Sequence, residues 1–306
     1  MKQFDEELAP DACLVTQLLR AQFPQLADHD VRPSQASGSS NFVFRVGEEW
    51  AVRLPRTDGY TADLLTEARW LPHLAPHLTV PVPEVLFLAR PSGLFPRPWS
   101  IVRWIPGEPP ERLDRGAQAR LATSLGRFMR QLHRLDACDL DLDPHQWGYR
   151  AGEPVTEVID RWADTAAEGL RDLFDPRQVK EAWRRLRRVP PASGPPCWIH
   201  TDLSSENLLV SGDGNLLGVL DFGGLSIGDR SVDLLYAWSM FDQEAREVVR
   251  RKAEADEATW LRARAWAFVG PGLLTIHDYR DCMPARTATL TAMVQAVAAE
   301  VGVSLR

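Results

Sequence analysis

Three polar residues in the segment 198–224 have the types and spacing needed to hold a metal ion beside a reacting hydroxyl. Asn207 opens the apolar run NLLV, Asp221 ends the run LLGVL, and Asp202 lies five residues before Asn207. The cluster Ser-Gly-Asp-Gly-Asn between the two runs predicts a β-hairpin, which brings Asn207 and Asp221 to the same end. One amide oxygen and one carboxylate are hard ligands of the kind that Mg²⁺ takes together with waters and substrate phosphates. Asp202 then adds a third oxygen group, either as another ligand or as a base that positions a hydroxyl.

The elements before these residues predict a small β-rich lobe. Residues 10–27 have helical spacing, and SQASGSSNFVFRV, the Gly-Glu-Glu turn at 47–49 and WAVRLPR together form a hairpin pattern. Residues 61–71 form a helical pattern that Pro72 is expected to end or kink. VPEVLFLA and PWSIVRW are expected strands, and the prolines and glycine of 106–110 mark a linker.

Beyond the linker the sequence becomes mainly helical around one strand-rich island. We therefore predict an α+β protein with a small β-rich lobe at 1–105, a hinge at about 102–107 and a helical lobe at 106–306, with a ligand cleft between the lobes. The island runs from Cys197 to Phe222. The expected helices are 114–136, 154–173, 176–188, 230–253, 257–269 and 285–301.

The composition is that of a soluble globular protein. Of 306 residues, 44% are hydrophobic and 25% are charged, and the net charge of −7 argues against nucleic acid as a partner and weakly favours cationic or neutral ligands. The N-terminus has no apolar signal region and no apolar stretch approaches the length of a membrane span, so we expect a cytoplasmic protein, monomeric or dimeric, without membrane contact. The four cysteines lie far apart and are expected to be reduced, buried or idle thiols.

The sequence His-Thr-Asp-Leu-Ser-Ser-Glu-Asn at 200–207, followed by Asp-Phe-Gly at 221–223, resembles the catalytic and metal loops of protein kinases. The surroundings are more similar to the aminoglycoside phosphotransferase family, the bacterial antibiotic kinases. The similar segments are GSSNFVFRVGEEWAVRLPR, WSIVRWIPGE, WIHTDLSSENLLV, LDFGGLSIGDRSVDLLYAWSMF and DEATWLRARAWAF, in that order, from about residue 35 to about residue 270. The resemblance implies a protein-kinase-like fold with a small antiparallel-sheet N-lobe and a larger, mainly helical C-lobe.

The same resemblance implies roles for individual residues. Asp202 would be the catalytic base, Asn207 and Asp221 would bind the Mg²⁺ that bridges the phosphates of ATP or GTP, and His200 would support the loop. Arg53 would contact the phosphates in place of the usual lysine, with Glu67 as its ion-pair partner. The remaining nucleotide contacts would come from Ser39 and Ser40 at the phosphates and from the backbone of Arg103 and Ile105 at the base.

The chain departs from the family pattern beside the acceptor hydroxyl. Thr201 stands where glycine is usual, and Ser204, Ser205 and Glu206 replace His-Pro-Gly-like residues. Because these positions lie beside the acceptor hydroxyl, the resemblance does not identify the acceptor molecule. A P-loop pattern is absent from the sequence, which excludes that route of nucleotide binding.

These features predict a Mg²⁺-dependent kinase that phosphorylates a small hydroxyl-bearing molecule, with an aminoglycoside or related antibiotic as the candidate acceptor. The alternatives are a metabolic kinase of the same fold, a nucleotide-binding regulatory protein without transfer activity, and a metal-dependent hydrolase. Asp229 and Asp233 are expected to cap the following helix or to hydrogen-bond the catalytic loop. The acidic residues of 157–172 are expected to form a solvated face, or a surface for a cationic acceptor if they border the cleft.

Overall fold

The computed structural model describes residues 9–34, 40–111, 113–137 and 155–306, which divide into two compact units. Unit 1 consists of residues up to Pro109 together with Glu206–Ser211 and Leu217–Leu225. Unit 2 consists of Pro110–Ser205, Gly212–Leu216 and Ser226–Arg306. The chain therefore passes between the units four more times after residue 110.

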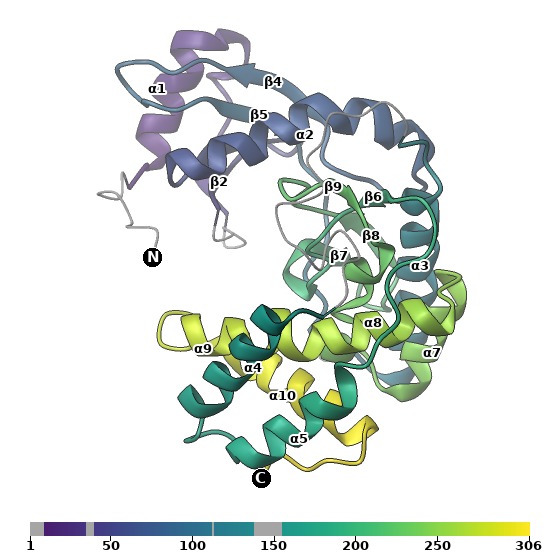
Figure 1. Ribbon diagram of the computed structural model, residues 1–306. Coiled ribbons are helices and arrows are strands. Elements are labelled where there is room, and N and C mark those ends of the chain that lie inside the picture. The colour runs from purple at the N-terminus through teal and green to yellow at the C-terminus, as the bar shows by residue number, and fades with distance from the viewer. Residues whose placement is uncertain (1–8, 35–39, 112, 138–154) are drawn as a thin grey trace. The chain divides into compact units, whose positions relative to one another are not determined.

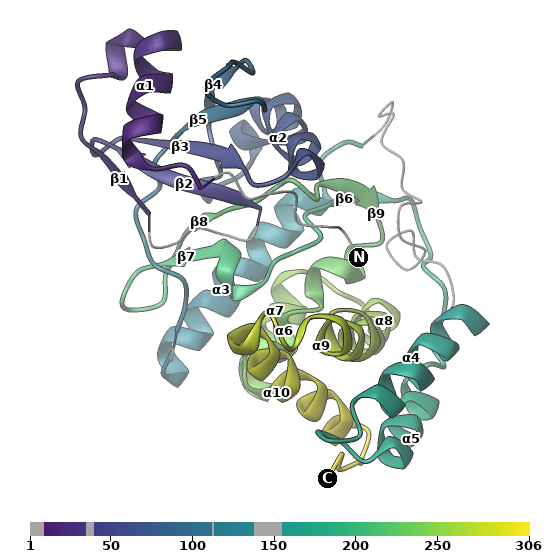
Figure 2. The ribbon, with the colours of Figure 1, turned by 90° about the vertical axis from the view of Figure 1, so that its left-hand side faces the viewer.

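Unit 1 is built on a five-stranded antiparallel sheet in the order β1-β2-β3-β5-β4 (Figures 1 and 2). The predicted hairpin is present: Phe44 pairs with Val52, and Gly47 in the turn has a φ of 55°, which glycine adopts without strain. The strands are β1 (Val31–Pro33), β2 (Asn41–Val46), β3 (Trp50–Pro55), β4 (Val85–Ala89) and β5 (Trp99–Arg103).

Two helices accompany this sheet. α1 (Ala12–Gln22) begins where Asp11 accepts a hydrogen bond from the Leu14 amide, and its apolar face joins the buried core of the sheet. α2 (Thr61–Leu74) continues past Pro72, so of the two predicted effects, an end or a kink of the helix, Pro72 does not end it. A proline this close to a helix end removes only one intrahelical hydrogen bond, and the last turn tolerates that loss.

The hairpin predicted around the Ser-Gly-Asp-Gly-Asn cluster is formed by β7 (Leu208–Val210) and β8 (Leu216–Val219). Residues of the predicted linker contact its first strand: Glu108 forms a β-bridge with Val210. Gly107 has a φ of 141°, and a Cβ at this position would lie 2.9 Å from the Leu209 side chain. The glycine thus allows a close approach of the two segments.

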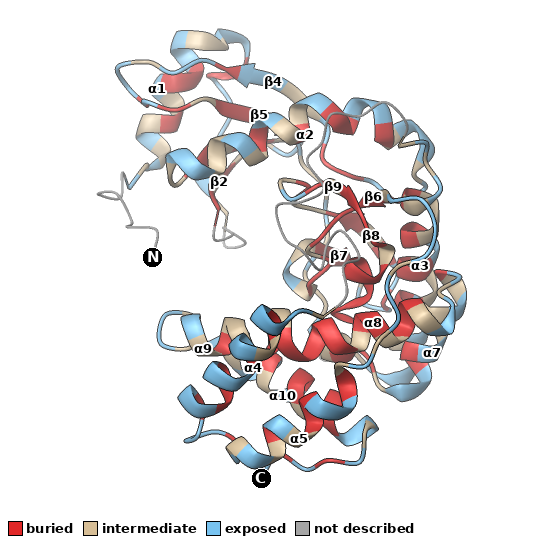
Figure 3. Cartoon of the chain, in the orientation of Figure 1, coloured by how far each residue is buried: buried red, intermediate tan, exposed pale blue. Residues whose placement is uncertain are grey.

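Unit 2 is mainly helical, with buried residues on the inward faces of its helices (Figure 3). α3 crosses α7 closely at Gly126, where a Cβ would lie 2.9 Å from the Val249 carbonyl oxygen. α4 and α5 lie side by side (Figure 2), and β6 pairs with β9. The larger elements are α3 (Arg115–His133), α4 (Glu157–Gly169), α5 (Pro176–Leu186), β6 (Cys197–Ile199), β9 (Ser226–Gly228), α7 (Gln243–Lys252), α8 (Glu257–Ala267) and α10 (Pro284–Glu300). The shorter ones are α6 (Ala237–Met240), a π-helical turn (Phe268–Leu274) and α9 (Thr275–Tyr279).

The helix predicted over 230–253 is interrupted in the structure. A 3₁₀ turn, η7 (Arg230–Leu234), precedes α6 and α7, and Phe241 between them has the extended dihedrals φ −125° and ψ 145°. Asp242 caps the start of α7 by accepting a hydrogen bond from the Ala245 amide at 2.9 Å. Helical spacing alone could not reveal these breaks, because short capped turns keep the same apolar pattern.

Three of the four cysteines fall within the described residues, and all three are free thiols, as predicted. Cys13 and Cys282 are exposed, whereas Cys197 is largely buried. Cys138 lies outside the described residues. In the described part of the chain, no helix has both the length and the apolar character that a membrane crossing requires.

Candidate active site

The loop that carries Asp202 follows β6 in unit 2 and is supported from within by His200. The His200 side chain is fully buried, and its Nδ1 accepts a hydrogen bond from the Asp202 amide at 3.3 Å. This contact requires the tautomer in which Nε2 carries the proton. The role predicted for His200, support of the loop, agrees with this geometry.

The backbone of the same loop is held by the buried carboxylate of Asp233. Its Oδ1 accepts a hydrogen bond from the Thr201 amide at 2.8 Å, and its Oδ2 accepts one from the His200 amide at 3.1 Å and lies 2.8 Å from His133 Nε2. Thr201 has a φ of 78°, a conformation that costs a β-branched residue roughly 1–3 kcal/mol. The expectation that Asp233 hydrogen-bonds the catalytic loop is confirmed, and these bonds offset the strain at Thr201.

Asp233 is held in its ionised form. Burial by itself would raise its pKa, but the hydrogen bond from His133, the neighbouring His200 and the Thr201 amide outweigh burial and lower the pKa below its usual value. The carboxylate therefore stays charged near neutral pH and keeps accepting these hydrogen bonds.

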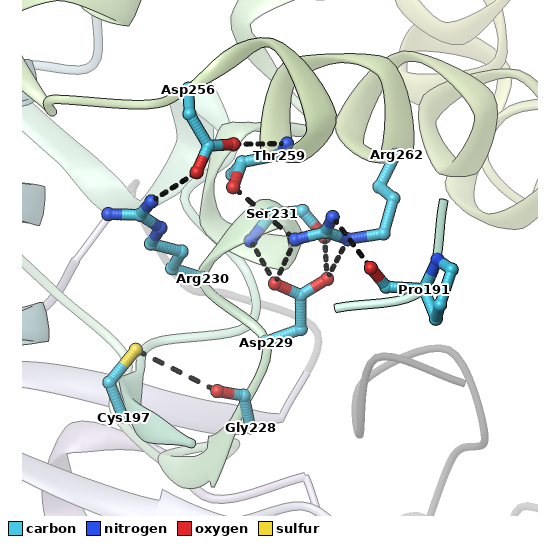
Figure 4. A network of polar contacts seen from close by, with 9 residues as sticks. All are labelled: Pro191, Cys197, Gly228, Asp229, Arg230, Ser231, Asp256, Thr259 and Arg262. Atoms are coloured by element: carbon cyan, nitrogen blue, oxygen red, sulfur yellow. Dashed lines mark hydrogen bonds and ion pairs between the residues drawn. The ribbon is translucent and has the colours of Figure 1, made fainter. Parts of the chain in front are cut away.

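A buried ion pair fixes the segment that carries Asp233 (Figure 4). Arg262 on α8 donates to both carboxylate oxygens of Asp229, at 2.7 and 3.0 Å, and both side chains are almost completely buried. Asp229 also accepts hydrogen bonds from the amide and hydroxyl of Ser231, at 3.3 and 2.5 Å, and so caps η7. The structural role predicted for Asp229 is confirmed, since it sets the start of the turn that places Asp233.

Unit 1 contains a second buried charge cluster, built on Glu67. Arg53 on β3 and Glu67 on α2 form an ion pair, and Glu67 Oε1 also accepts a hydrogen bond from the Phe222 amide at 2.8 Å. Burial would lower the pKa of Arg53, but the charges of Glu67 and Asp221 raise it. The predicted ion pair is therefore present, and Glu67 links the arginine directly to the Asp-Phe-Gly loop.

Asp221 and Asn207 lie at the same end of the β7–β8 hairpin, as the sequence pattern predicts. The Leu220 amide donates to the Asn207 carbonyl oxygen at 2.8 Å, and Asp221 is the next residue along the chain. Asp221 has a φ of 57°, and its Oδ2 lies 3.4 Å from the Ser40 hydroxyl. The left-handed backbone of Asp221 costs strain that the hydrogen bond from Phe222 to Glu67 helps to offset.

The donor set at this hairpin end fits Mg²⁺. It offers one carboxylate and one side-chain amide, and Mg²⁺ typically takes one or two protein carboxylates with waters and substrate phosphates. Among residues 9–34, 40–111, 113–137 and 155–306, no group of three or more His, Cys, Asp or Glu side chains could hold a metal ion.

The other predicted nucleotide contacts are placed as follows. Arg103 ends β5; its amide donates to the Glu84 carbonyl oxygen at 3.0 Å and its side chain to the Glu84 carboxylate at 2.6 Å. Ile105 follows β5 and lies close to Gly218, where a Cβ would be 2.8 Å from Ile105 Cγ2. Ser39 lies outside the described residues.

The acidic residues of α4 and the turn after it are largely neutralised within unit 2. Four of the carboxylates form ion pairs: Glu157 with Arg161 at 4.0 Å, Asp160 with Arg187 at 2.6 Å, Glu168 with Lys180 at 2.9 Å and Asp172 with Arg280 at 2.8 Å. These contacts agree with a surface charge network and reduce the negative charge available to a cationic ligand.

Two residues near Asp202 were not predicted from the sequence. Arg286 Nη2 lies 3.6 Å from Asp202 Oδ1 and donates a hydrogen bond to the Tyr236 hydroxyl at 3.2 Å. Tyr236 lies in the family-like segment LDFGGLSIGDRSVDLLYAWSMF, but the resemblance assigns it no role, and Arg286 lies 84 positions from Asp202, outside every similar segment. Only tertiary structure brings them together.

Comparison with known proteins shows which family the chain resembles. The family model described as "Phosphotransferase enzyme family" matches residues 34–266. An aminoglycoside 3'-phosphotransferase of Escherichia coli is 28% identical over 68% of this chain and 71% of its own length. One from Streptomyces fradiae is 27% identical over 79% of this chain and 86% of its own.

Solved structures resemble the whole chain. The GDP and kanamycin complex of APH(2")-IIia has a TM-score of 0.66 at 20% identity and covers 94% of this chain and 98% of its own. Macrolide 2'-phosphotransferase MphH from Brachybacterium faecium has a TM-score of 0.61 at 21% identity and covers 93% and 97%. The predicted kinase-like α+β fold is thereby confirmed. Since the family model spans most of the sequence, the chain belongs to the phosphotransferase enzyme family.

Proposed function

We propose that the protein transfers the γ-phosphoryl group of ATP or GTP to a hydroxyl of a small molecule, with an aminoglycoside or a related antibiotic as acceptor. The observation that carries the proposal is the contact set of buried Glu67, which holds Arg53 on one side and the Phe222 amide on the other. Phosphoryl transfer depends on positioning and charge neutralisation, and this contact set fixes a permanent cation beside the carboxylate of Asp221.

Unit 1 supplies the nucleotide-binding residues in this proposal. Arg53 binds the α- and β-phosphates, Ser40 and Ser39 cover the phosphates, and the backbone of Arg103 and Ile105 contacts the base. Asn207 and Asp221 hold Mg²⁺, which supplies charge neutralisation at the phosphate oxygens when bound. The proposed nucleotide lobe is the predicted 1–105 segment, together with the hairpin end that carries the metal ligands.

Asp202 on unit 2 is the proposed base. Its carboxylate accepts a hydrogen bond from the acceptor hydroxyl and orients the oxygen for in-line attack. It takes the proton as the new bond to the γ-phosphorus forms and the bond from that phosphorus to the bridging oxygen of the departing ADP or GDP breaks. The support for this role is the rigid mounting of its loop, whose amides at 200 and 201 are both bonded to Asp233.

The acceptor class rests on the relatives. Aminoglycoside phosphotransferases are among the similar sequences, and structural neighbours are described in complexes with kanamycin, gentamicin or streptomycin, or as macrolide 2'-phosphotransferases. Because four carboxylates of the acidic run are paired within the chain, an aminoglycoside is not favoured over a macrolide by charge alone.

The test is a nucleotide-coupled acceptor screen of the purified protein. ATP and GTP are each supplied with Mg²⁺ and with kanamycin, gentamicin, streptomycin or a macrolide, and ADP or GDP release is measured together with the mass of the acceptor. We expect one acceptor class to gain 80 Da, the mass of one phosphoryl group. Nucleotide binding without modification of any acceptor would favour the regulatory alternative.

A further inference from the structure

We propose that Tyr236 and Arg286 are positioning residues for Asp202: they hold one carboxylate oxygen so that the other faces the acceptor hydroxyl. The inference rests on the proposed function, because it assigns these residues a task only if Asp202 acts as the base. All three residues belong to unit 2.

The contacts converge on one edge of the Asp202 carboxylate. Arg286 Nη2 lies 3.6 Å from Oδ1, and the same nitrogen donates to the Tyr236 hydroxyl at 3.2 Å. The Tyr236 hydroxyl also lies near enough to Asp202 for the negative charge of the carboxylate to raise the pKa of Tyr236. Arg286 therefore contacts both Asp202 and Tyr236, and the three side chains form one cluster.

The atoms of the Asp202 side chain differ in their exposure to solvent. Oδ1 is inaccessible to solvent, whereas the side chain as a whole is 37% exposed. The exposure must therefore come from the remaining atoms, and Oδ2 is the polar atom among them. A carboxylate held in this way presents one oxygen to a hydroxyl, and the orientation of that oxygen is set by the groups behind the other.

The position of Arg286 in α10 indicates that its charge serves a partner outside this helix. Arg286 is the third residue of α10, which begins at Pro284. A positive charge in the first turn of a helix is opposed by the helix dipole, so this arginine does not stabilise α10 electrostatically. The carboxylate of Asp202 provides a favourable partner that compensates for this placement.

Tyr236 keeps its proton throughout the range in which an enzyme works. Burial raises its pKa well above the usual value, and the negative charge of Asp202 raises it further, with only partial compensation by Arg286. The hydroxyl is thus a permanent donor, as the role of orienting a carboxylate requires.

The experiment measures kcat and KM for the best acceptor of the screen in Arg286→Ala, Arg286→Lys and Tyr236→Phe. We expect Arg286→Ala to lower kcat roughly 30-fold with KM changed less than threefold, because a displaced base loses alignment rather than acceptor binding. Arg286→Lys should recover most of the loss, since the positive charge remains within reach. Tyr236→Phe should lower kcat about tenfold.

Two controls separate positioning from a general effect on stability. Arg250→Ala removes an arginine of similar exposure, which pairs with Glu257 at 2.5 Å, and should leave kcat unchanged. In an Asp202→Asn background, Arg286→Ala should cause no further loss, because Arg286 acts through Asp202.

Each other outcome contradicts a defined part of the reasoning. An active protein whose kcat is unaffected by Arg286→Ala, or whose losses from Arg286→Ala and Asp202→Asn are additive, would refute positioning and leave the proposed function standing. A wild-type protein that modifies none of the four acceptors would remove the proposed function and this role with it.

Discussion

Replacing Asp233 with alanine would remove one side chain that accepts hydrogen bonds from two backbone amides and contacts a histidine. The amides of His200 and Thr201 lie at 3.1 and 2.8 Å from its oxygens, and His133 Nε2 lies at 2.8 Å. All of these groups are buried or nearly so, so water cannot replace the lost acceptor without opening the loop.

The expected cost follows from the number of donors left without an acceptor. An unsatisfied buried donor costs about 1–3 kcal/mol, so two amides and one imidazole predict a loss of about 3–9 kcal/mol in the free energy of unfolding. That is a large part of the ~5–15 kcal/mol typical of a folded protein. Asp233→Asn keeps the shape of the side chain, but its NH₂ group faces an N–H donor that the carboxylate of Asp233 accepts from. This variant should lose about 2 kcal/mol in the free energy of unfolding and remain folded.

Hydrogen exchange measures the effect where it occurs. In Asp233→Asn we expect exchange at the 200–201 amides to accelerate roughly 30-fold, the equivalent of about 2 kcal/mol. We also expect kcat to fall about 100-fold, because the strained Thr201 backbone would relax and displace Asp202. Asp229→Asn is the matched control: it weakens the buried pair with Arg262 and lowers overall stability.

When the two variants have the same free energy of unfolding, exchange at the 200–201 amides should accelerate less in Asp229→Asn than in Asp233→Asn. Unchanged protection of the two amides in Asp233→Asn would refute the reasoning.

The pH dependence of stability gives a second check, because the pKa of Asp233 is lower in the folded protein than the ordinary 3.8. The stabilisation is complete above about pH 4 and disappears as pH falls through the folded pKa. The unfolding midpoint of the wild type should therefore decline more steeply below pH 4 than that of Asp233→Asn.

Three further predictions concern single side chains. Asp202→Ala should abolish acceptor phosphorylation while nucleotide affinity, measured by calorimetry, changes less than threefold; comparable turnover in this variant would remove Asp202 from its role as base. Asp221→Asn should weaken nucleotide binding by at least tenfold in the presence of Mg²⁺ and much less without it, and equal losses under both conditions would contradict metal binding there. Burial raises the pKa of Cys197 to about 12, so iodoacetamide at pH 8 should label the exposed Cys13 and Cys282 but not Cys197, as mapped by mass spectrometry; rapid labelling of Cys197 in the folded protein would be inconsistent with its burial.

The local elements of this protein are largely determined by short-range sequence patterns. The hairpin of β2 and β3, the hairpin of β7 and β8 and most helices follow from apolar periodicity and turn residues. The hairpin also determines that Asn207 and Asp221 share one end, because antiparallel pairing relates the two residues directly. The same patterns missed the breaks between η7, α6 and α7, where caps rather than periodicity decide the boundaries.

Tertiary structure alone decided which distant charges meet. The sequence offered no basis for placing Tyr236 and Arg286 near Asp202. It predicted that Asp233 would cap a helix or bond the catalytic loop, but only the structure identifies the amides at 200 and 201 as the donors. These contacts join segments more than 30 residues apart, and no periodicity encodes such distances. The physical reason is that a buried charge takes its partner from whichever elements the packed core brings beside it, and that choice is made only when the chain folds.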